Sequence, residues 1–125
     1  MLISEHHILT AAHCVATYPK GRFIVRLGDH HTDVVDVSEI DVNIENIYIH
    51  EKFNNTNGLV NDVALILLKT QIRFNDYIQP ICLPPKGAIY RPNMNCTISG
   101  WGSTQSGKAG KLKYFSFLDR NMPLS

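Results

Sequence analysis

Short segments rich in valine and isoleucine recur along this 125-residue chain, and their pattern leaves little room for anything except a β fold. The segments show a period of two residues or short apolar runs, and clusters of Gly, Asn, Asp and Pro separate them. No stretch keeps the apolar spacing of a helix over three turns. The candidate strands are residues 8–10, 22–27, 40–49, 63–68, 96–99 and 112–118. The pattern predicts an all-β sandwich or small barrel.

The candidate strand 40–49 changes its side-chain parity midway. Apolar residues occupy even positions up to Ile44 and odd positions from Ile47. Because side chains alternate between the two faces of a strand, one extra residue is needed if a single face is to stay buried. We therefore expect a β-bulge near Glu45 and Asn46.

The charge balance excludes several classes of partner. Twelve Lys and Arg residues oppose eleven Asp and Glu residues, and the net charge is +1. This balance offers no electrostatic grip on nucleic acid or anionic lipid. The longest apolar run, residues 63–68, is far shorter than the roughly 20 residues that cross a bilayer. We expect neither nucleic-acid binding nor a membrane span in this segment.

Two residues far apart in the sequence have the types needed for proton transfer. His13 follows the first candidate strand on a turn of small residues, and Asp62 is a lone carboxylate at the start of the most apolar strand. An Asp that accepts the Nδ1 proton of a histidine fixes its tautomer and stabilises the imidazolium. Taken singly, His13 also fits a core histidine and Asp62 a turn residue that caps a strand.

Five sequence blocks, in order, carry a resemblance to a known family. They read Leu-Thr-Ala-Ala-His-Cys at 9–14, Val-Arg-Leu-Gly at 25–28, Asn-Asp-Val-Ala-Leu at 61–65, Gln-Pro-Ile-Cys-Leu-Pro at 79–84 and Ser-Gly-Trp-Gly at 99–102. The sequence resembles the trypsin-like (chymotrypsin-fold) serine proteases over nearly its whole length, most weakly at 105–120. The resemblance implies an antiparallel Greek-key β-barrel, the first of two. Residues 1–125 would be a partial peptidase domain, truncated at both ends.

The resemblance also implies a function. His13 would be the general base and Asp62 its orienting carboxylate in a Ser-His-Asp endopeptidase that cleaves protein or peptide substrates. The family's nucleophilic Ser lies in a Gly-Asp-Ser-Gly-Gly motif of the second barrel, and no serine here has that surrounding. We therefore expect the chain alone to be inactive. The alternatives are a non-catalytic, protease-like binding or decoy module and a pseudoprotease whose nucleophile is replaced.

Three cysteines, Cys14, Cys82 and Cys96, leave at least one thiol unpaired within the chain. By resemblance, Cys14 bonds a cysteine upstream of Met1 and Cys96 one in the second barrel. Cys82 would tie the domain to an upstream propeptide or accessory region. The alternative is ordinary buried thiols in a cytosolic protein.

Two sequons, at Asn54 and Asn95, are candidate N-glycosylation sites. With the cysteines they favour a secreted or extracellular protein. The first residues have neither the basic nor the apolar region of a signal peptide, so on this expectation the signal lies upstream.

The sequence predicts no cofactor, with one metal site as an open alternative. Some members of the resembled family bind calcium in the loop that corresponds to residues 28–40. Asp29, Asp36 and Glu39 fall on matching positions, and carboxylate oxygens suit Ca²⁺. The six histidines show no zinc-binding spacing.

Overall fold

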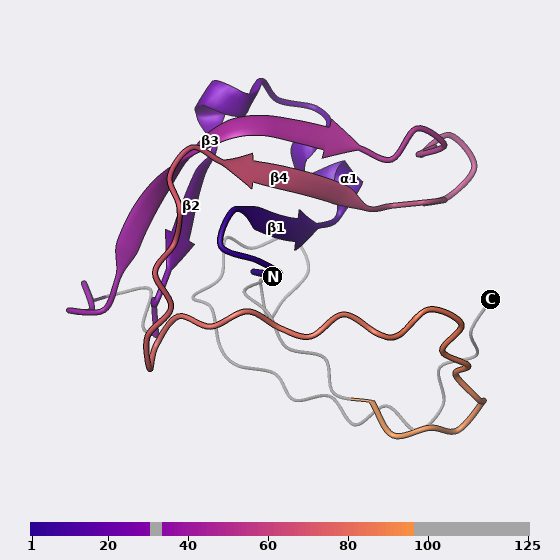
Figure 1. Cartoon of the computed structure of the whole chain (residues 1–125). Helices are drawn as coiled ribbons and strands as arrows, with labels where there is room; N and C mark the ends of the chain where they lie inside the picture. The colour runs from indigo at the N-terminus through magenta and orange to yellow at the C-terminus, as the bar shows by residue number, and fades with distance from the viewer. Residues whose placement is uncertain (31–33, 97–125) are drawn as a thin grey trace. The chain divides into compact units, whose positions relative to one another are not determined.

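The predicted strands 8–10, 22–27, 40–49 and 63–68 form one antiparallel sheet in the computed structural model, which describes residues 1–30 and 34–96 (Figure 1). Residues 1–30 and 35–83 make up one unit, and residues 31–34 and 84–125 a second. All helices and strands of the described residues belong to the first unit. In chain order they are β1 (His7–Thr10), α1 (Ala12–Val15), the 3₁₀ helix η1 (Lys20–Arg22), β2 (Ile24–Leu27), β3 (Ile40–Ile49) and β4 (Ala64–Leu68).

The sheet has the strand order β1-β4-β3-β2. Three consecutive strands, β2, β3 and β4, are neighbours, and β1 lies beside β4 rather than beside β2. This is the Greek-key order, with the long connection between β1 and β2 carrying α1 and η1. The predicted all-β, antiparallel class is confirmed, and the described strands form half of a barrel.

The bulge predicted in β3 is also confirmed. The first part of β3 pairs with β2, up to Asn43, and the second part pairs with β4, from Ile44 to Ile49. The register shifts between Ile44 and Asn46. The extra residue keeps Val42 buried before the shift and Ile47 partly buried after it. β3 thereby bends from β2 onto β4, as Figure 1 shows.

The core lies against the inner face of this sheet and beneath α1. Alternate residues of β4 are buried, because the pleat directs every second side chain inward. The buried hydrophobic residues are Leu2, Ile8, Ala12, Val15, Val42, Ala64, Ile66, Leu68, Ile72 and Ile78.

The outer edge of β1 is covered by the first residues of the chain. Leu2 forms an isolated bridge with Ile8, and the amide of Leu9 donates to the carbonyl of Met1 at 2.8 Å. The amide of Ile3 donates to the carbonyl of His7 at 2.9 Å. β1 is therefore paired on both sides.

The element bounds differ from the sequence prediction in several places. β1 begins at His7, one residue before the predicted strand 8–10. The strand predicted at 22–27 begins at Ile24, because η1 takes Lys20–Arg22, and β4 begins at Ala64. Helix α1 was not predicted, since four residues are too few to show a helical period. The predicted strands 96–99 and 112–118 lie outside the described residues, except for Cys96, which is in no strand.

No helix among the described residues is long and apolar enough to span a bilayer.

Substitution of Gly28, which directly follows β2, would test how the loop that leads to β3 is packed. Its φ of 72° is left-handed, and a Cβ there would overlap the carbonyl oxygen of Ser38. We expect Gly28→Ala to lower the free energy of unfolding by about 2 kcal/mol, because a left-handed alanine costs roughly 1–2 kcal/mol and the clash adds to it. Urea unfolding measures the difference. Gly21→Ala is the matched control, because a Cβ at Gly21 meets nothing within 4 Å. Equal losses in the two variants would contradict this account.

Candidate active site

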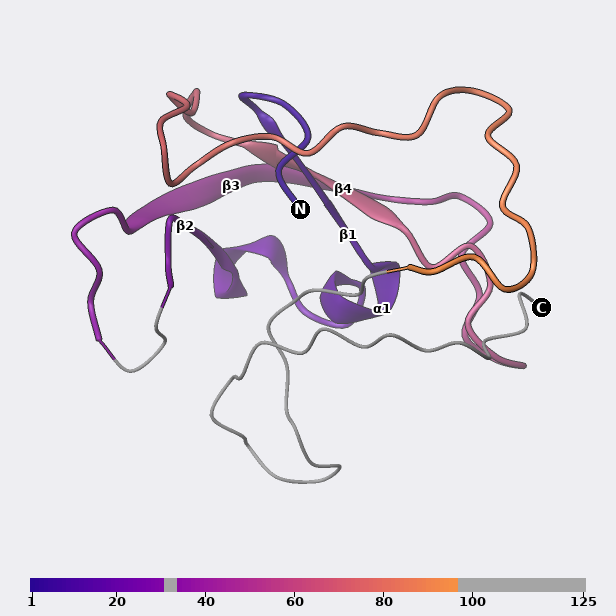
Figure 2. The same cartoon turned by 90° about the horizontal axis from the view of Figure 1, so that it is seen from below.

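The pairing of β1 with β4 brings His13 and Asp62 together. The register sets Thr10, the last residue of β1, opposite Ala64, the first residue of β4. Because the strands are antiparallel, the chain leaving β1 and the chain entering β4 lie at the same end of the sheet. His13 lies in α1 directly after β1, and Asp62 lies directly before β4. Figure 2 shows α1 at that end of β1 from a second direction.

Two hydrogen bonds join the two residues. The His13 ring Nδ1 lies 2.6 Å from Oδ2 of Asp62, and the His13 amide donates to Oδ1 at 2.8 Å. The side chain of His13 is 50% exposed and that of Asp62 is 18% exposed. His13 is therefore not a core histidine, and a mostly covered carboxylate holds a ring that solvent can reach.

The same carboxylate caps helix α1. Ala11 stands at the N-cap and has no side chain to serve the free amides, so Asp62 accepts hydrogen bonds from the amides of His13 and Ala12. The His13 amide is the main cause that lowers the pKa of Asp62; partial burial opposes it, and the hydrogen bond and charge of the His13 ring add to the lowering. Asp62 thus caps a turn and orients the imidazole at once.

The contact with Asp62 also decides which ring nitrogen of His13 can accept a proton. When Nδ1–H donates to Oδ2, the neutral ring has an unprotonated Nε2. The Cys14 sulfur lies 3.5 Å from that nitrogen. Nε2 is thus able to take a proton from a hydroxyl or a thiol, and Asp62 is placed to stabilise the imidazolium that forms.

Comparison with known proteins agrees with this geometry. The model of the trypsin family matches residues 1–120. The chain belongs to the trypsin family. It is 36% identical over 106 residues to chymotrypsin-like elastase family member 1 of Rattus norvegicus. That alignment covers 84% of the chain and 39% of the relative. It is 39% identical over 103 residues to chymotrypsin-C of Bos taurus, covering 81% of the chain and 37% of the relative.

A further member, trypsin-2 of Salmo salar, is 35% identical over 116 residues, covering 90% of the chain and 46% of the relative. The chain therefore spans less than half the length of each of these relatives. The predicted membership of the trypsin-like serine proteases, which are hydrolases, is confirmed for the residues that match.

The predicted cysteine and glycosylation sites are all at the surface. Cys14, Cys82 and Cys96 are exposed and none forms a disulfide within this chain, so the alternative of ordinary buried thiols is wrong. Asn54 is exposed between β3 and β4, where its Oδ1 accepts the amide of Thr56 at 2.7 Å. Asn95 is exposed, and the threonine of its sequon lies outside the described residues. Glycosylation and disulfides to cysteines beyond this chain stay predictions.

Two of the three carboxylates predicted to bind calcium, Glu39 and Asp36, have partners within the protein. Glu39 lies 2.8 Å from Nε of Arg26, and Asp36 accepts the amide of His30 at 2.7 Å. One carboxylate oxygen of Asp29 is buried without a hydrogen-bond partner. Among the described residues, no three His, Cys, Asp or Glu side chains are close enough to hold a metal ion. Calcium binding in this loop, which includes residues 31–33, stays a prediction.

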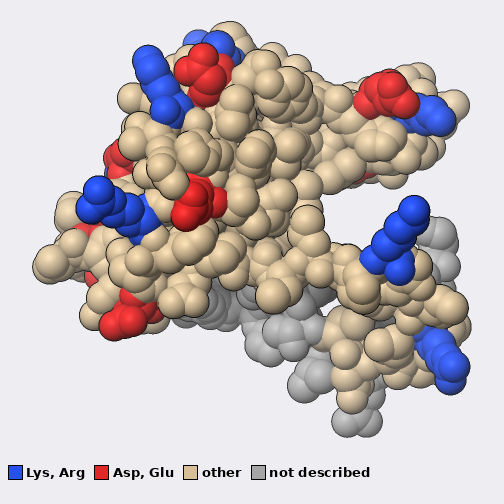
Figure 3. All heavy atoms as spheres, in the orientation of Figure 1, with Lys and Arg blue, Asp and Glu red and all other residues tan. Residues whose placement is uncertain are grey.

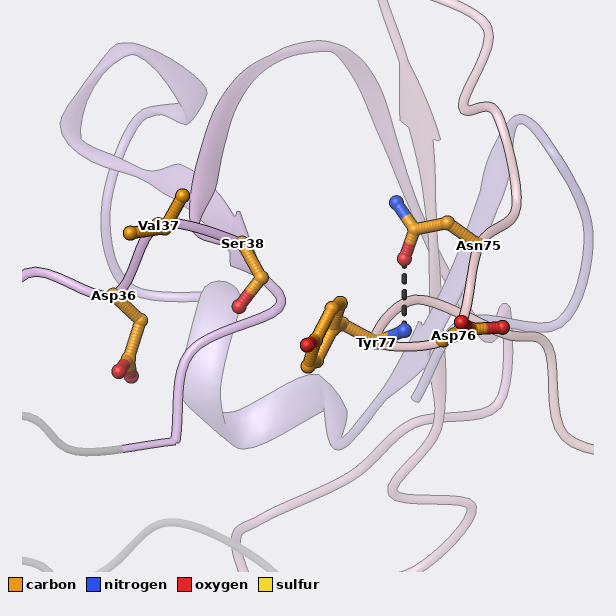
Figure 4. A pocket seen from close by; sticks show the side chains of 6 residues that line it. All are labelled: Asp36, Val37, Ser38, Asn75, Asp76 and Tyr77. Carbon is orange, nitrogen blue, oxygen red and sulfur yellow. Dashed lines mark hydrogen bonds between the residues drawn. The ribbon is translucent and has the colours of Figure 1, made fainter.

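A hollow of about 560 Å³ opens between the segment before β3 and the turn after β4, at the other end of the sheet from His13. Figure 4 shows the Tyr77 ring directed toward Ser38, while the Tyr77 amide donates to Oδ1 of Asn75 at 2.8 Å. The lining residues are Asp36, Val37, Ser38, Asn75, Asp76 and Tyr77. They include no histidine, so this hollow lacks the imidazole found at the other end of the sheet. On the face seen in Figure 3, basic and acidic side chains of the described residues are interspersed.

Sequence reasoning missed two features of the site. The first is that Asp62 caps α1. Its signal was the run Ala11-Ala12, which places free amides after a strand without any polar side chain to receive them. The second is the contact between Cys14 and the ring of His13. Neighbouring residues in a sequence do not ordinarily face each other, so the adjacency of the two letters gave no signal for it.

Acidification should remove the stability that Asp62 contributes. Its pKa is lower in the folded protein than the ordinary 3.8, so the unfolded chain takes up the proton first as the pH falls. The contribution is complete above the unfolded-state pKa and is lost as the pH falls through the folded-state pKa. Tm measured from about pH 6 to about pH 2 should therefore fall more steeply for the native chain than for Asp62→Asn.

Asp76→Asn is the control for this comparison. Asp76 is exposed in the turn after β4, far along the chain from α1, and its replacement should leave the slope of Tm against pH close to that of the native chain. Equal slopes for the native chain and Asp62→Asn would show that the hydrogen bonds to Asp62 do not stabilise the folded state.

Proposed function

We propose that this chain carries the general base and its orienting carboxylate of a secreted serine endopeptidase that cleaves protein substrates by Ser-His-Asp acyl transfer. His13 is the base and Asp62 the carboxylate. The observation that carries the proposal is the 2.6 Å contact between Nδ1 of His13 and Oδ2 of Asp62, in a chain that belongs to the trypsin family.

The geometry supports a defined sequence of proton transfers. Nε2 of His13 takes the proton of a serine hydroxyl as its oxygen attacks the peptide carbonyl, and the imidazolium donates that proton to the leaving amine. Water then repeats the cycle on the acyl-enzyme, giving its proton to Nε2 and releasing the acid and the serine. Asp62 stays ionised throughout, because the amides of α1 hold its pKa low.

On our proposal, the attacking serine lies outside these 125 residues. Ser4, for example, lies beside β1 and contacts Nδ1 of His7 at 2.8 Å, not His13. No serine has the Gly-Asp-Ser-Gly-Gly surrounding of the family's nucleophile, and the oxyanion-hole amides and specificity pocket belong to the second barrel. The second barrel is thus the partner that completes the site, and the three exposed cysteines and the exposed Asn54 fit an extracellular, disulfide-bonded glycoprotein.

The proposal predicts activity only when the second barrel is present. The chain of 125 residues should hydrolyse chromogenic peptide esters and amides no faster than buffer. The product of the full coding sequence should contain a Gly-Asp-Ser-Gly-Gly block and hydrolyse them. In that protein Asp62→Asn should lower kcat by about 10⁴, the loss known for this carboxylate in the Ser-His-Asp template. His13→Ala should lower it by about 10⁶.

His50→Ala is the matched control in this assay, because His50 is an exposed histidine after β3 whose ring Nδ1 accepts the amide of Lys52 at 3.1 Å. It should leave kcat close to that of the unmodified enzyme. A coding sequence without the serine block would overturn the proposal. A short chain that unfolds cooperatively, stays soluble and binds a protein without cleaving it would favour the binding or decoy module instead.

A further inference from the structure

We propose that Asn61 is a positioning residue, which fixes the turn that carries Asp62 and so directs the Asp62 carboxylate at His13. The inference rests on the proposed function, because the pair that Asn61 positions is the base and the orienting carboxylate of that proposal. Asn61 acts through Asp62, since its own side chain bonds to the backbone of Lys52.

The backbone of Asn61 has an uncommon conformation. Its φ is 52°, in the left-handed region, and within residues 1–30 and 34–96 only Asn93 and three glycines share a positive φ. Asparagine enters this region more readily than most residues that have a side chain. A residue in this region costs free energy and persists only where the surrounding contacts hold it. Directly before Asp62, it sets the direction in which the chain enters the carboxylate-bearing residue.

Asp62 lies at the centre of a tight turn. The amide of Val63 donates to the carbonyl of Asn61 at 2.8 Å, which is the hydrogen bond of a three-residue γ-turn. On the far side of the turn, the amide of His50 donates to the carbonyl of Val63 at 3.1 Å and continues the pairing of β3 with β4. The turn is therefore attached to the sheet through Val63 on one side, and Asn61 forms its other side.

The side chain of Asn61 attaches that other side. Its Nδ2 donates to the carbonyl of Lys52 at 3.0 Å, which joins the segment entering β4 to the segment that leaves β3. Further from the sheet, Asn54 and Val60 join the same two segments through a reciprocal pair of backbone hydrogen bonds at 3.0 and 2.9 Å. Asn61 thus supplies a side-chain link between two backbone links, in the position next to Asp62.

The carboxylate is sensitive to the orientation of this turn. Oδ1 of Asp62 accepts the His13 amide at 2.8 Å, while Oδ2 lies 2.6 Å from Nδ1 of the ring. Both oxygens belong to one planar group, so a rotation of the turn lengthens or bends at least one of the two contacts, and hydrogen bonds weaken steeply when bent. The His13 amide is the main cause that lowers the pKa of Asp62, so that pKa reports the position of the carboxylate.

NMR spectroscopy of the full, isotope-labelled chain tests the position of the carboxylate without any activity. One measurement is the titration of the Asp62 carboxyl carbon, and the other is the low-field proton signal of Nδ1–H of His13. Asn61→Ala removes the donor and disfavours a left-handed backbone. It should raise the pKa of Asp62 toward its ordinary value and abolish the low-field signal. Asn61→Gly removes the donor but adopts the left-handed backbone freely, so it should fold and change both signals less, in the same direction.

Asn93→Ala is the matched control. Asn93 is also an exposed asparagine with a left-handed backbone, at φ 67°, and it lies far along the chain from Asp62. Its replacement should leave both signals at their native values. A role of Asn61 in stability alone would lower Tm and leave the two signals of the folded protein unchanged, so the signals separate positioning from stability.

The full-length enzyme gives a second reading. Asn61→Ala should lower kcat by about tenfold with KM nearly unchanged, because a displaced carboxylate impairs the base and leaves the contacts with substrate in place; misplacement by about 1 Å can cost about 10²-fold. Asn61→Gly should recover part of the loss. Asn93→Ala should change neither constant.

The proposal fails if Asn61→Gly matches the native chain in both NMR signals, because the link to Lys52 is then not needed. It also fails if a folded Asn61→Ala protein keeps both signals, or if Asn93→Ala shifts them equally. These outcomes differ from failure of the proposed function. A coding sequence without the serine block would overturn the endopeptidase, and the NMR comparison would still decide whether Asn61 positions Asp62.

Discussion

The register between β1 and β4 is the constraint on which the rest of the site depends. His13 and Asp62 lie 49 residues apart, and neither lies within a strand. They meet because Thr10 and Ala64 are directly opposite each other. The chain therefore leaves β1 and enters β4 at the same end of the sheet. A slip of one residue would turn the buried side chains of β4 to its other face, so the packing of Ile66 and Leu68 holds the two polar residues in place.

One carboxylate serves two structural purposes at that end. Asp62 receives the amides that open α1 and also the ring of the histidine that α1 carries. The hydrogen bonds from the backbone amides fix the position of the Asp62 carboxylate independently of the His13 ring. The ring then has one orientation in which Nδ1 reaches Oδ2. Preorganisation of this kind is what proton transfer requires, because groups that are already placed need no rearrangement during the reaction.

Much of this arrangement could be predicted from the sequence. The features that could not be predicted have one physical reason in common. Strand positions and the bulge in β3 followed from parity, because alternation along a strand is a property of every residue in it. The pairing of His13 with Asp62 followed from their residue types and from the family's motifs. Helix α1, the cap by Asp62 and the Cys14 contact depend on local backbone angles and on a single side-chain rotamer, which leave no periodic trace. One carboxylate of the calcium prediction, Glu39, pairs with an arginine that the sequence pattern did not place there: Arg26 and Asp41 are cross-strand partners, and the guanidinium also reaches Glu39.

The covering of β1 by the first residues has a consequence for how copies of the chain meet one another. A strand with an open row of amides and carbonyls is a template onto which another molecule can add a strand, and half-barrels are rich in such borders. Here Leu2 and its neighbours already occupy the hydrogen-bonding groups of the strand that leads to His13. Within the described residues, intermolecular sheet growth on the histidine side would have to displace these contacts, and β2 is the other border of the sheet.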